Sequence, residues 1–159
     1  MSAYVLGRGG EAAIVDTGVA GSEGTIGDAL SAAGLGWDAV GHVILTHRHR
    51  DHAGSIDAVV AAAKDATAYA GAADIPSITT TRPLTAVADG ETVFGLRIVA
   101  TPGHTLGHIA VLDEAGGLLV AGDALRTAEG ALAGSNPDFT DDVAQAKASI
   151  ARGGPQTVR

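Results

Sequence analysis

The stretch ILTHRHRDHAG, residues 44–54, constrains this chain more than any other part of its sequence. It joins an apolar run to three histidines and an aspartate, which all lie within residues 47–52. Residues 40–46 predict a buried strand, and apolar residues at helical spacing over 56–63 predict a helix directly after the cluster. A strand that ends in imidazole and carboxylate groups predicts a metal site rather than a solvated, histidine-rich loop.

The order of side chains in the cluster predicts two groups of metal ligands. In extended backbone, His47 and His49 point to the same side and can bind one ion together. Where the chain turns into the helix, Asp51 and His52 can point to a second position nearby. Imidazole and carboxylate groups suit zinc, iron or manganese. The chain has no cysteine, so thiolate ligands and disulfides are excluded.

Two more ligand-type residues follow apolar strands. His104 lies in the sequence TPGHTLGH, where proline and glycine predict a tight turn. Asp123 lies in LLVAGDAL, at the point where an apolar strand ends. Either residue alone favours a structural interpretation, because a strand-end aspartate is usually a cap or a turn former. Together with the histidine cluster, they predict that residues distant in sequence complete the metal site.

Strand and helix patterns mix along the whole chain, which predicts a single α/β or α+β domain over residues 1–159. We expect strands at 3–6, 12–15, 92–94, 96–100, 109–112 and 118–121, a short strand at Tyr69, helices at 26–33 and 140–151, and a loop at 74–85. Gly34 is expected to cap the first of these helices, and Thr140 to cap the start of the last.

The charge and hydropathy of the chain argue against several classes of partner. A net charge of −8 repels the phosphate backbone of nucleic acids, whose binding depends largely on lysine and arginine. No apolar run approaches the length of a membrane span, and the N-terminus lacks the order of a secretory signal. We therefore expect a cytoplasmic protein with a small-molecule substrate and with neither a nucleic-acid nor a membrane partner.

Four motifs occur in an order that resembles the metallo-β-lactamase-fold superfamily. They are IVDTG at 14–18, THRHRDHAG at 46–54, TPGHTLGH at 101–108 and AGDAL at 121–125. Within this superfamily, the motifs of the chain are most similar to those of the glyoxalase II and lactonase-like hydrolases. The resemblance covers nearly the whole length of the chain. It implies an αβ/βα sandwich, in which two mixed sheets pack face to face, helices lie outside, and metal ions bind at one edge.

The resemblance implies which residues hold each of two metal ions, expected to be zinc, with iron or manganese as alternatives. The implied ligands are His47, His49 and His104 for the first ion, Asp51 and His52 for the second, and Asp123 as a bridge between them. Some relatives carry cysteine at the position of Asp123, so this chain differs from the true β-lactamases of that type.

Three further residues have more than one interpretation. By resemblance, Asp16 would orient the histidine-rich loop through hydrogen bonds, as metal ligands generally require; the alternative is a simple turn residue. His108 would belong to the hydrogen-bond network around the ligands, or it would be a buried structural histidine. His42, which stands alone in its part of the sequence, is expected to be a surface or core residue.

The resemblance is incomplete near the C-terminus. Members with two metals have one more histidine on a late, glycine-rich loop, whereas here no histidine follows His108. Residues 151–155 resemble the far flank of that loop, and the chain is shorter than typical members at both ends. We therefore expect a sandwich that is incomplete at its C-terminal end, a well-occupied first site and a weaker second one. An uncovered sheet edge would favour a homodimer.

These residues predict a metal-dependent hydrolase. Water activated by the metal would attack a carbonyl or phosphoryl centre, and the metal would stabilise the developing oxyanion. Asp51 is the candidate catalytic residue, because a carboxylate beside the nucleophile can accept or pass a proton. Small esters, thioesters and lactones are the expected substrates.

Two alternatives to a hydrolase stay open. The first is a mononuclear iron enzyme that resembles the sulfur dioxygenases of this fold, with His47, His104 and Asp123 as ligands. The second is a non-catalytic remnant or interaction domain that keeps a metal only for folding.

Overall fold

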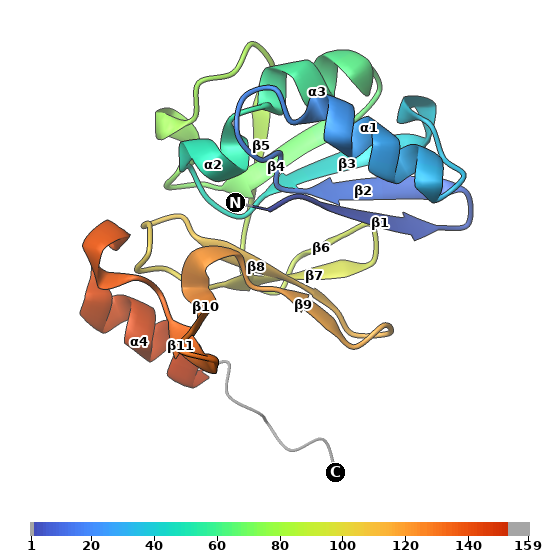
Figure 1. Cartoon of the computed structure of the whole chain (residues 1–159). Helices are drawn as coiled ribbons and strands as arrows, with labels where there is room; N and C mark the ends of the chain where they lie inside the picture. The colour runs from blue at the N-terminus through green and yellow to red at the C-terminus, as the bar shows by residue number, and fades with distance from the viewer. Residues whose placement is uncertain (1, 153–159) are drawn as a thin grey trace.

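Two β-sheets stack face to face, and helices cover the outer face of the larger sheet (Figure 1). The structure is a computed structural model, and it describes residues 2–152. The larger sheet has five strands in the order β1 (Tyr4–Arg8), β2 (Glu11–Val15), β3 (Val40–Leu45), β4 (Thr67–Gly71) and β5 (Leu84–Val87). The first pair is antiparallel and the other neighbours are parallel. This sheet is therefore mixed, as expected.

The second sheet is antiparallel throughout. Its four strands are β6 (Thr92–Val93), β7 (Leu96–Ala100), β8 (Ile109–Asp113) and β9 (Leu118–Val120). It differs from the expected second mixed sheet because its connections are too short for the crossover that a parallel pair needs. A separate hairpin of β10 (Leu125–Ala128) and β11 (Ala131–Gly134) follows, in a region where no strands were expected.

Four α-helices accompany the sheets in the part of the chain that the structure describes. They are α1 (Glu23–Ala32), α2 (Arg50–Ala53), α3 (Ile56–Ala62) and α4 (Val143–Arg152). Helices α1 and α3 lie over the five-stranded sheet, α2 is a single turn near the end of β3, and α4 contacts β11 (Figure 1). Within residues 2–152, no helix is long and apolar enough to cross a bilayer.

Each face of the five-stranded sheet buries its own apolar cluster. Ala12 and Ile14 of β2 belong to the cluster that packs against α1 and α3. Ala13 and Val15, which alternate with them, belong to the cluster that packs against the second sheet, for example with Ile98. Strands covered on both faces must be apolar on both sides, which explains the uninterrupted apolar runs in the sequence. The predicted sandwich class is confirmed.

The helix expected over residues 56–63, directly after the histidine cluster, is α3; the additional turn α2 precedes it, and tertiary contacts separate the two. Gly54 N donates a hydrogen bond to Gly18 O (2.9 Å), and Ser55 Oγ donates one to Val19 O (2.6 Å). A methyl group at Gly54 would lie only 2.7 Å from Ala20 N, so the break packs tightly against the loop that follows β2. The break therefore ends the single turn of α2, which carries Asp51 and His52, whereas His47 and His49 precede that turn.

The last helix begins at Val143, and Thr140 does not cap it. Asp142 is the cap, because its Oδ1 accepts a hydrogen bond from Gln145 N (2.9 Å). Thr140 instead donates its hydroxyl to Asn136 O (2.6 Å). The expected cap was therefore wrong by two residues, and the hydroxyl of Thr140 is directed away from the helix.

Smaller differences concern element ends. The first helix ends at Ala32, so Ala33 is exposed rather than buried, and Gly34 follows with a φ of 72°. Residues 84–87 form β5 although most of the preceding segment is a loop, because pairing with β4 extends the sheet. The resemblance of residues 153–155 to a family loop lies outside the described residues.

A glycine at the end of β4 gives a direct test of the packing. A methyl group at Gly71 would overlap the carbonyl oxygen of Gly107, whereas one at Gly41 of β3 would meet no atom within 4 Å. We expect Gly71→Ala to lower the free energy of unfolding by about 1–3 kcal/mol, the usual cost of overpacking. The matched Gly41→Ala variant should change it by less than about 0.5 kcal/mol. Urea unfolding measures both changes. Equal losses of unfolding free energy in the two variants would contradict the close contact described at Gly71.

Candidate metal centre

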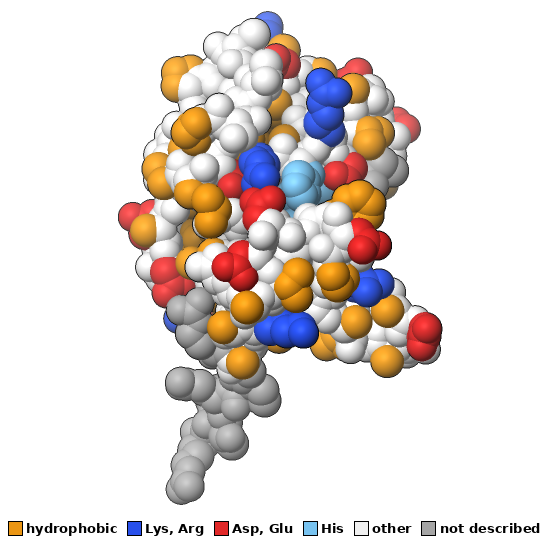
Figure 2. Space-filling model, turned by 90° about the vertical axis from the view of Figure 1, so that its left-hand side faces the viewer, with side chains coloured by type: hydrophobic (Ala, Val, Ile, Leu, Met, Phe, Trp, Pro, Cys, Tyr) orange, Lys and Arg blue, Asp and Glu red, His pale blue; other side chains and the backbone are white. Residues whose placement is uncertain are grey.

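The candidate ligands converge from three separate segments of the described chain at one end of the molecule. His47 and His49 follow β3, Asp51 and His52 lie in α2, His104 lies in the turn between β7 and β8, and Asp123 lies in a short 3₁₀ turn after β9. In Figure 2, histidine atoms are visible on this face between acidic and basic side chains. The apolar strands thus deliver polar side chains from distant parts of the sequence to one place.

Two groups of ligand atoms are close enough to surround a metal ion. One consists of His47, His49 and His104, and the other of His47, His52 and Asp123. Within each group the ligand atoms lie within 4.8 Å of one another. The first group matches the first set expected from sequence. In the second group His47 takes part, and Asp51 does not.

His47 presents Nε2 to both groups because its other nitrogen is already bonded. Thr46 Oγ1 lies 2.7 Å from Asp16 Oδ2, a carboxylate oxygen to which it can only donate. The hydroxyl oxygen therefore accepts from His47 Nδ1 at 3.0 Å, which leaves Nε2 with its lone pair. Burial and the neighbouring imidazoles lower the pKa of His47, so the ring is neutral. Its Nε2 is buried and has no hydrogen-bond partner among residues 2–152.

His52 lies between two carboxylates. Its Nδ1 is 2.7 Å from Asp16 Oδ2, and its Nε2 is 3.1 Å from Asp123 Oδ1 without the geometry of a hydrogen bond. Burial acts to lower the pKa of His52, but its contacts with Asp123 and Asp16 raise the pKa to about 9. Contact with His52 in turn lowers the pKa of Asp123 to about 2. The surroundings of Nε2 therefore stabilise positive charge, whether a proton or a metal ion supplies it.

His104 is oriented in the same way from the opposite side of the site. The hydroxyl of Thr140 donates to Asn136 O, so its oxygen is the acceptor for His104 Nδ1 at 3.2 Å. His104 Nε2 then faces His49 Nδ1 at 3.0 Å and Asp123 Oδ2 at 3.5 Å. Burial lowers the pKa of His104.

His108 lies behind the ligand groups and is not part of either. Its Nδ1 is 2.7 Å from Thr101 Oγ1, and its Nε2 accepts a hydrogen bond from the backbone N–H of Asp123 at 3.2 Å. Burial and the neighbouring His104 lower its pKa to about 3. Both ring nitrogens are thus already bonded, and His108 connects Thr101, which follows β7, to the turn that carries Asp123.

Asp16 connects β3 to α2 from a fully buried position. It accepts a hydrogen bond from Thr46 N (2.7 Å) in addition to its contacts with the Thr46 hydroxyl and with His52. Its φ of 60° is unusual for a residue other than glycine, and burial raises the pKa of its carboxyl group. Asp16 therefore positions one residue on each side of the cluster, which a simple turn residue would not do.

Asp51 and His42 lie apart from the two ligand groups. The Asp51 side chain is 46% exposed, and its Oδ2 is 3.6 Å from His52 Nε2, at the margin of the second group. His42 is half-buried on β3, where its ring packs near Tyr69 and Phe94. His42 therefore belongs to neither ligand group, which agrees with its isolated position in the sequence.

The donor set fits a divalent cation. Imidazole nitrogens and one carboxylate are ligands that zinc, iron and manganese accept. Two buried imidazole nitrogens, His47 Nε2 and His52 Nε2, point into the site without a hydrogen-bond partner. Buried polar atoms normally have partners, so an ion at this position would account for both.

Several residues around the ligands carry no signal in the sequence. Asp74, Arg48, Thr140 and Asp141 all bond to the loops that hold the imidazoles. Asp74 follows an apolar strand, as Asp123 does, and that position is the one feature that singles it out. The others are ordinary polar residues until the fold brings them together.

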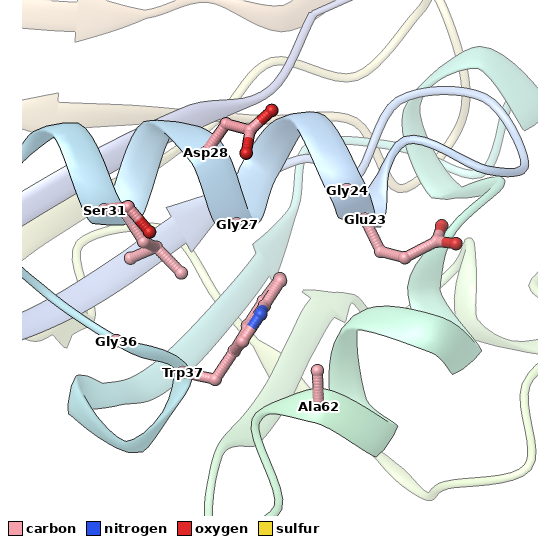
Figure 3. Close-up of a pocket in the computed structure, with 9 residues that line it drawn as sticks. Glu23, Gly24, Gly27, Asp28, Ser31, Gly36, Trp37 and Ala62 are labelled. Atoms are coloured by element: carbon pink, nitrogen blue, oxygen red, sulfur yellow. The ribbon is translucent and has the colours of Figure 1, made fainter.

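A cavity of the described chain lies elsewhere. It has a volume of about 300 Å³ and is bounded by α1, Trp37 and Ala62 of α3 (Figure 3). Trp37 stands between the two helices, and no candidate metal ligand lines the space. This cavity is therefore separate from the candidate metal centre.

The fold and the ligand set define a known class of protein. The family model of the metallo-beta-lactamase superfamily matches residues 2–153, and the chain belongs to this superfamily. The structure is similar to that of TTHA1623 in a di-iron-bound form, with a TM-score of 0.80 and 24% identity. The match covers 96% of this chain and 81% of that one.

Curated relatives include proteins with named activities. YobT of Bacillus subtilis (strain 168), an uncharacterized protein, is 29% identical over 148 residues, which cover 79% of this chain and 62% of YobT. A hydroxyacylglutathione hydrolase of Acidiphilium cryptum is 38% identical over 118 residues, covering 69% and 43%. Thioesterase pkgB of Emericella nidulans is 32% identical over 123 residues, covering 76% and 34%. The chain thus spans less than two thirds of the length of these relatives.

Proposed function

We propose that the protein is a zinc-dependent hydrolase of a small ester, thioester or lactone. The observation that carries the proposal is the convergence of His47 Nε2 and His52 Nε2, both buried and without hydrogen-bond partners, on the carboxylate of Asp123. An unsatisfied buried polar atom costs about 1–3 kcal/mol. A cation bound by these atoms would remove that cost.

The names of two relatives support an acyl substrate. One is a hydroxyacylglutathione hydrolase and the other a thioesterase. Two exposed apolar side chains next to the site fit such a substrate. Leu106 lies in the loop between His104 and His108, and Phe139 precedes Thr140, whose hydroxyl contacts His104. They offer a surface for the apolar part of an acyl compound.

We assign metal binding and proton transfer to different residues of the chain. His47, His49 and His104 would hold one ion, and Asp123 would join that group to His52. The chemistry that a divalent ion would supply there is Lewis acidity, which polarises an acyl group and makes water nucleophilic near neutral pH. Asp51, half-exposed at the margin of the site, would accept a proton from the attacking water.

Metal analysis combined with a substrate panel tests the proposal. Protein purified without added metal should contain at least one divalent ion per chain, predominantly zinc. It should hydrolyse members of a panel of esters, thioesters and lactones. A chelator should abolish turnover, and added zinc should restore it. Since a ligand at about 1,000 times its Kd stabilises a fold by roughly 4 kcal/mol, zinc should also raise Tm.

Other outcomes would point to the two alternatives. Iron as the bound metal, with oxygen consumption in the presence of a persulfide, would favour a sulfur dioxygenase-like enzyme. A zinc-loaded protein that turns over no member of the panel, and whose Tm falls when zinc is removed, would favour a metal-stabilised, non-catalytic domain. Either result would overturn the proposal that the protein is a hydrolase.

A further inference from the structure

A buried carboxylate outside the ligand groups joins the two loops that hold the imidazoles. Asp74 lies between β4 and a short 3₁₀ turn, and it is 1% exposed. Its Oδ2 accepts hydrogen bonds from Arg48 N (2.9 Å) and from Thr105 Oγ1 (2.6 Å). Its Oδ1 accepts one from Gly107 N (2.8 Å). One side chain therefore contacts both loops.

The partners of Asp74 lie directly beside the ligands. Arg48 separates His47 from His49, and Thr105 follows His104. A carboxylate that holds both main-chain segments fixes the separation of the two loops. Across that separation, His49 Nδ1 lies 3.0 Å from His104 Nε2.

The side chain of Asp74 is not needed for its own turn. An aspartate at the N-cap of a helix usually accepts a hydrogen bond from that helix, but the Asp74 side chain makes no such bond. Its packing is equally specific, because a methyl group at Gly107 would lie 2.8 Å from Asp74 Cγ. The contacts of Asp74 are thus made with the two loops of the site.

A second connection between the loops runs over the surface. The Arg48 guanidinium lies 3.0 Å from Asp141 Oδ2, and Asp141 N donates to His104 O at 3.1 Å. The Asp141 side chain is 39% exposed, and exposed ion pairs are screened by water and contribute little. The buried connection through Asp74 should therefore dominate.

We propose that Asp74 is a positioning residue that sets the geometry of the His47, His49 and His104 group and thereby its affinity for a divalent metal ion. The inference rests on the metal site of the proposed function. Outer hydrogen-bond partners of metal ligands typically change affinity by about 10–100-fold when they are replaced. Asp74 acts on the main chain beside the ligands rather than on an imidazole itself.

Zinc binding by Asp74→Asn tests the proposal, with Kd measured by competition with a chromophoric chelator. We expect the Kd to rise about 10–100-fold relative to the wild-type chain. The visible absorption of the cobalt-loaded protein should change, because cobalt reports ligand geometry. Asp141→Asn, which weakens only the exposed connection, should raise the zinc Kd by less than about 5-fold.

Asp57 supplies a matched control. Its Oδ1 accepts hydrogen bonds from Thr80 Oγ1 (2.8 Å), Thr81 N (2.7 Å) and Thr81 Oγ1 (2.9 Å), and neither threonine lies in a loop that holds a candidate ligand. Asp57→Asn should lower Tm and leave the zinc Kd unchanged. If Asp74→Asn behaved in the same way, Asp74 would be merely structural and the inference would be overturned.

Two further results keep the test decisive. If Asp74→Asn does not fold, Thr105→Val removes one donor at nearly constant volume and should raise the zinc Kd roughly 5-fold, the equivalent of one hydrogen bond. An unchanged Kd in that variant would overturn the inference. A wild-type chain that binds no zinc would overturn the proposed function itself, whereas equal binding by wild type and variant would overturn only the role of Asp74.

Discussion

Replacing Asp123 by alanine is expected to reduce kcat/KM for ester or thioester hydrolysis by roughly 10³-fold or more. The carboxylate of Asp123 belongs to the second ligand group, 3.1 Å from His52 Nε2, and it also lies 3.5 Å from His104 Nε2 of the first group. Its loss leaves the second group with two imidazoles and no negative charge. A lost transition-state stabilisation of about 4 kcal/mol, within the range that metal ions supply, corresponds to this factor.

Steady-state kinetics and metal content measured on the same samples separate the effects of this change. Asp123→Asn keeps the shape of the side chain and should lose nearly as much activity, because charge rather than size is removed. Asp28→Ala replaces an exposed aspartate of α1, away from the ligands, and should retain wild-type turnover. Wild-type turnover by Asp123→Ala at full metal loading would refute the assigned role.

Asp16→Ala should produce the largest loss of stability among the variants considered. The substitution leaves Thr46 N and His52 Nδ1 buried without their acceptor. Breaking a buried charged pair by removing one partner costs about 3–5 kcal/mol. For a chain of this size, that loss lowers Tm by roughly 6–20 °C. The positive φ of residue 16 adds to the effect, since alanine adopts it reluctantly.

Asparagine provides the graded comparison at the same position. Asp16→Asn tolerates the positive φ and retains an acceptor for Thr46 N, so its stability should fall between that of wild type and Asp16→Ala. Asp89→Ala removes an exposed carboxylate that accepts one backbone hydrogen bond from Ala100 N, and it should cost about 1 kcal/mol or less. Thermal unfolding ranks all four proteins; an Asp16→Ala variant within 1 kcal/mol of wild type would disprove the account.

Apolar runs were the most reliable signal for the fold. Residues 12–15 and 40–45 are predicted as strands because both faces of the larger sheet are covered. The hairpin of β10 and β11 was missed, since exposed residues such as Arg126 and Leu132 give it no apolar pattern. The helical turn α2 was not expected, and its separation from α3 depends on a hydrogen bond from Gly54 to Gly18, far away in the sequence.

For the candidate ligands, too, local patterns in the sequence were recognised, whereas contacts between distant segments were not. His47, His49 and His52 stand out in the sequence because they are close together in it. His104 and Asp123 stand out only because each follows an apolar strand. The grouping of His47 with His52 and Asp123, and the marginal position of Asp51, depend on how α2 packs beside Asp16.

The sequence by itself determined the class of fold and the identity of the imidazoles and carboxylates at the centre. Local patterns suffice for these, because strand periodicity and ligand chemistry are properties of short segments. Only the tertiary structure decided which nitrogen of each imidazole is free and which residues hold the loops in place. Those features arise from Asp16, Asp74 and Thr140, whose hydrogen bonds join segments 26–36 residues apart and so leave no local pattern.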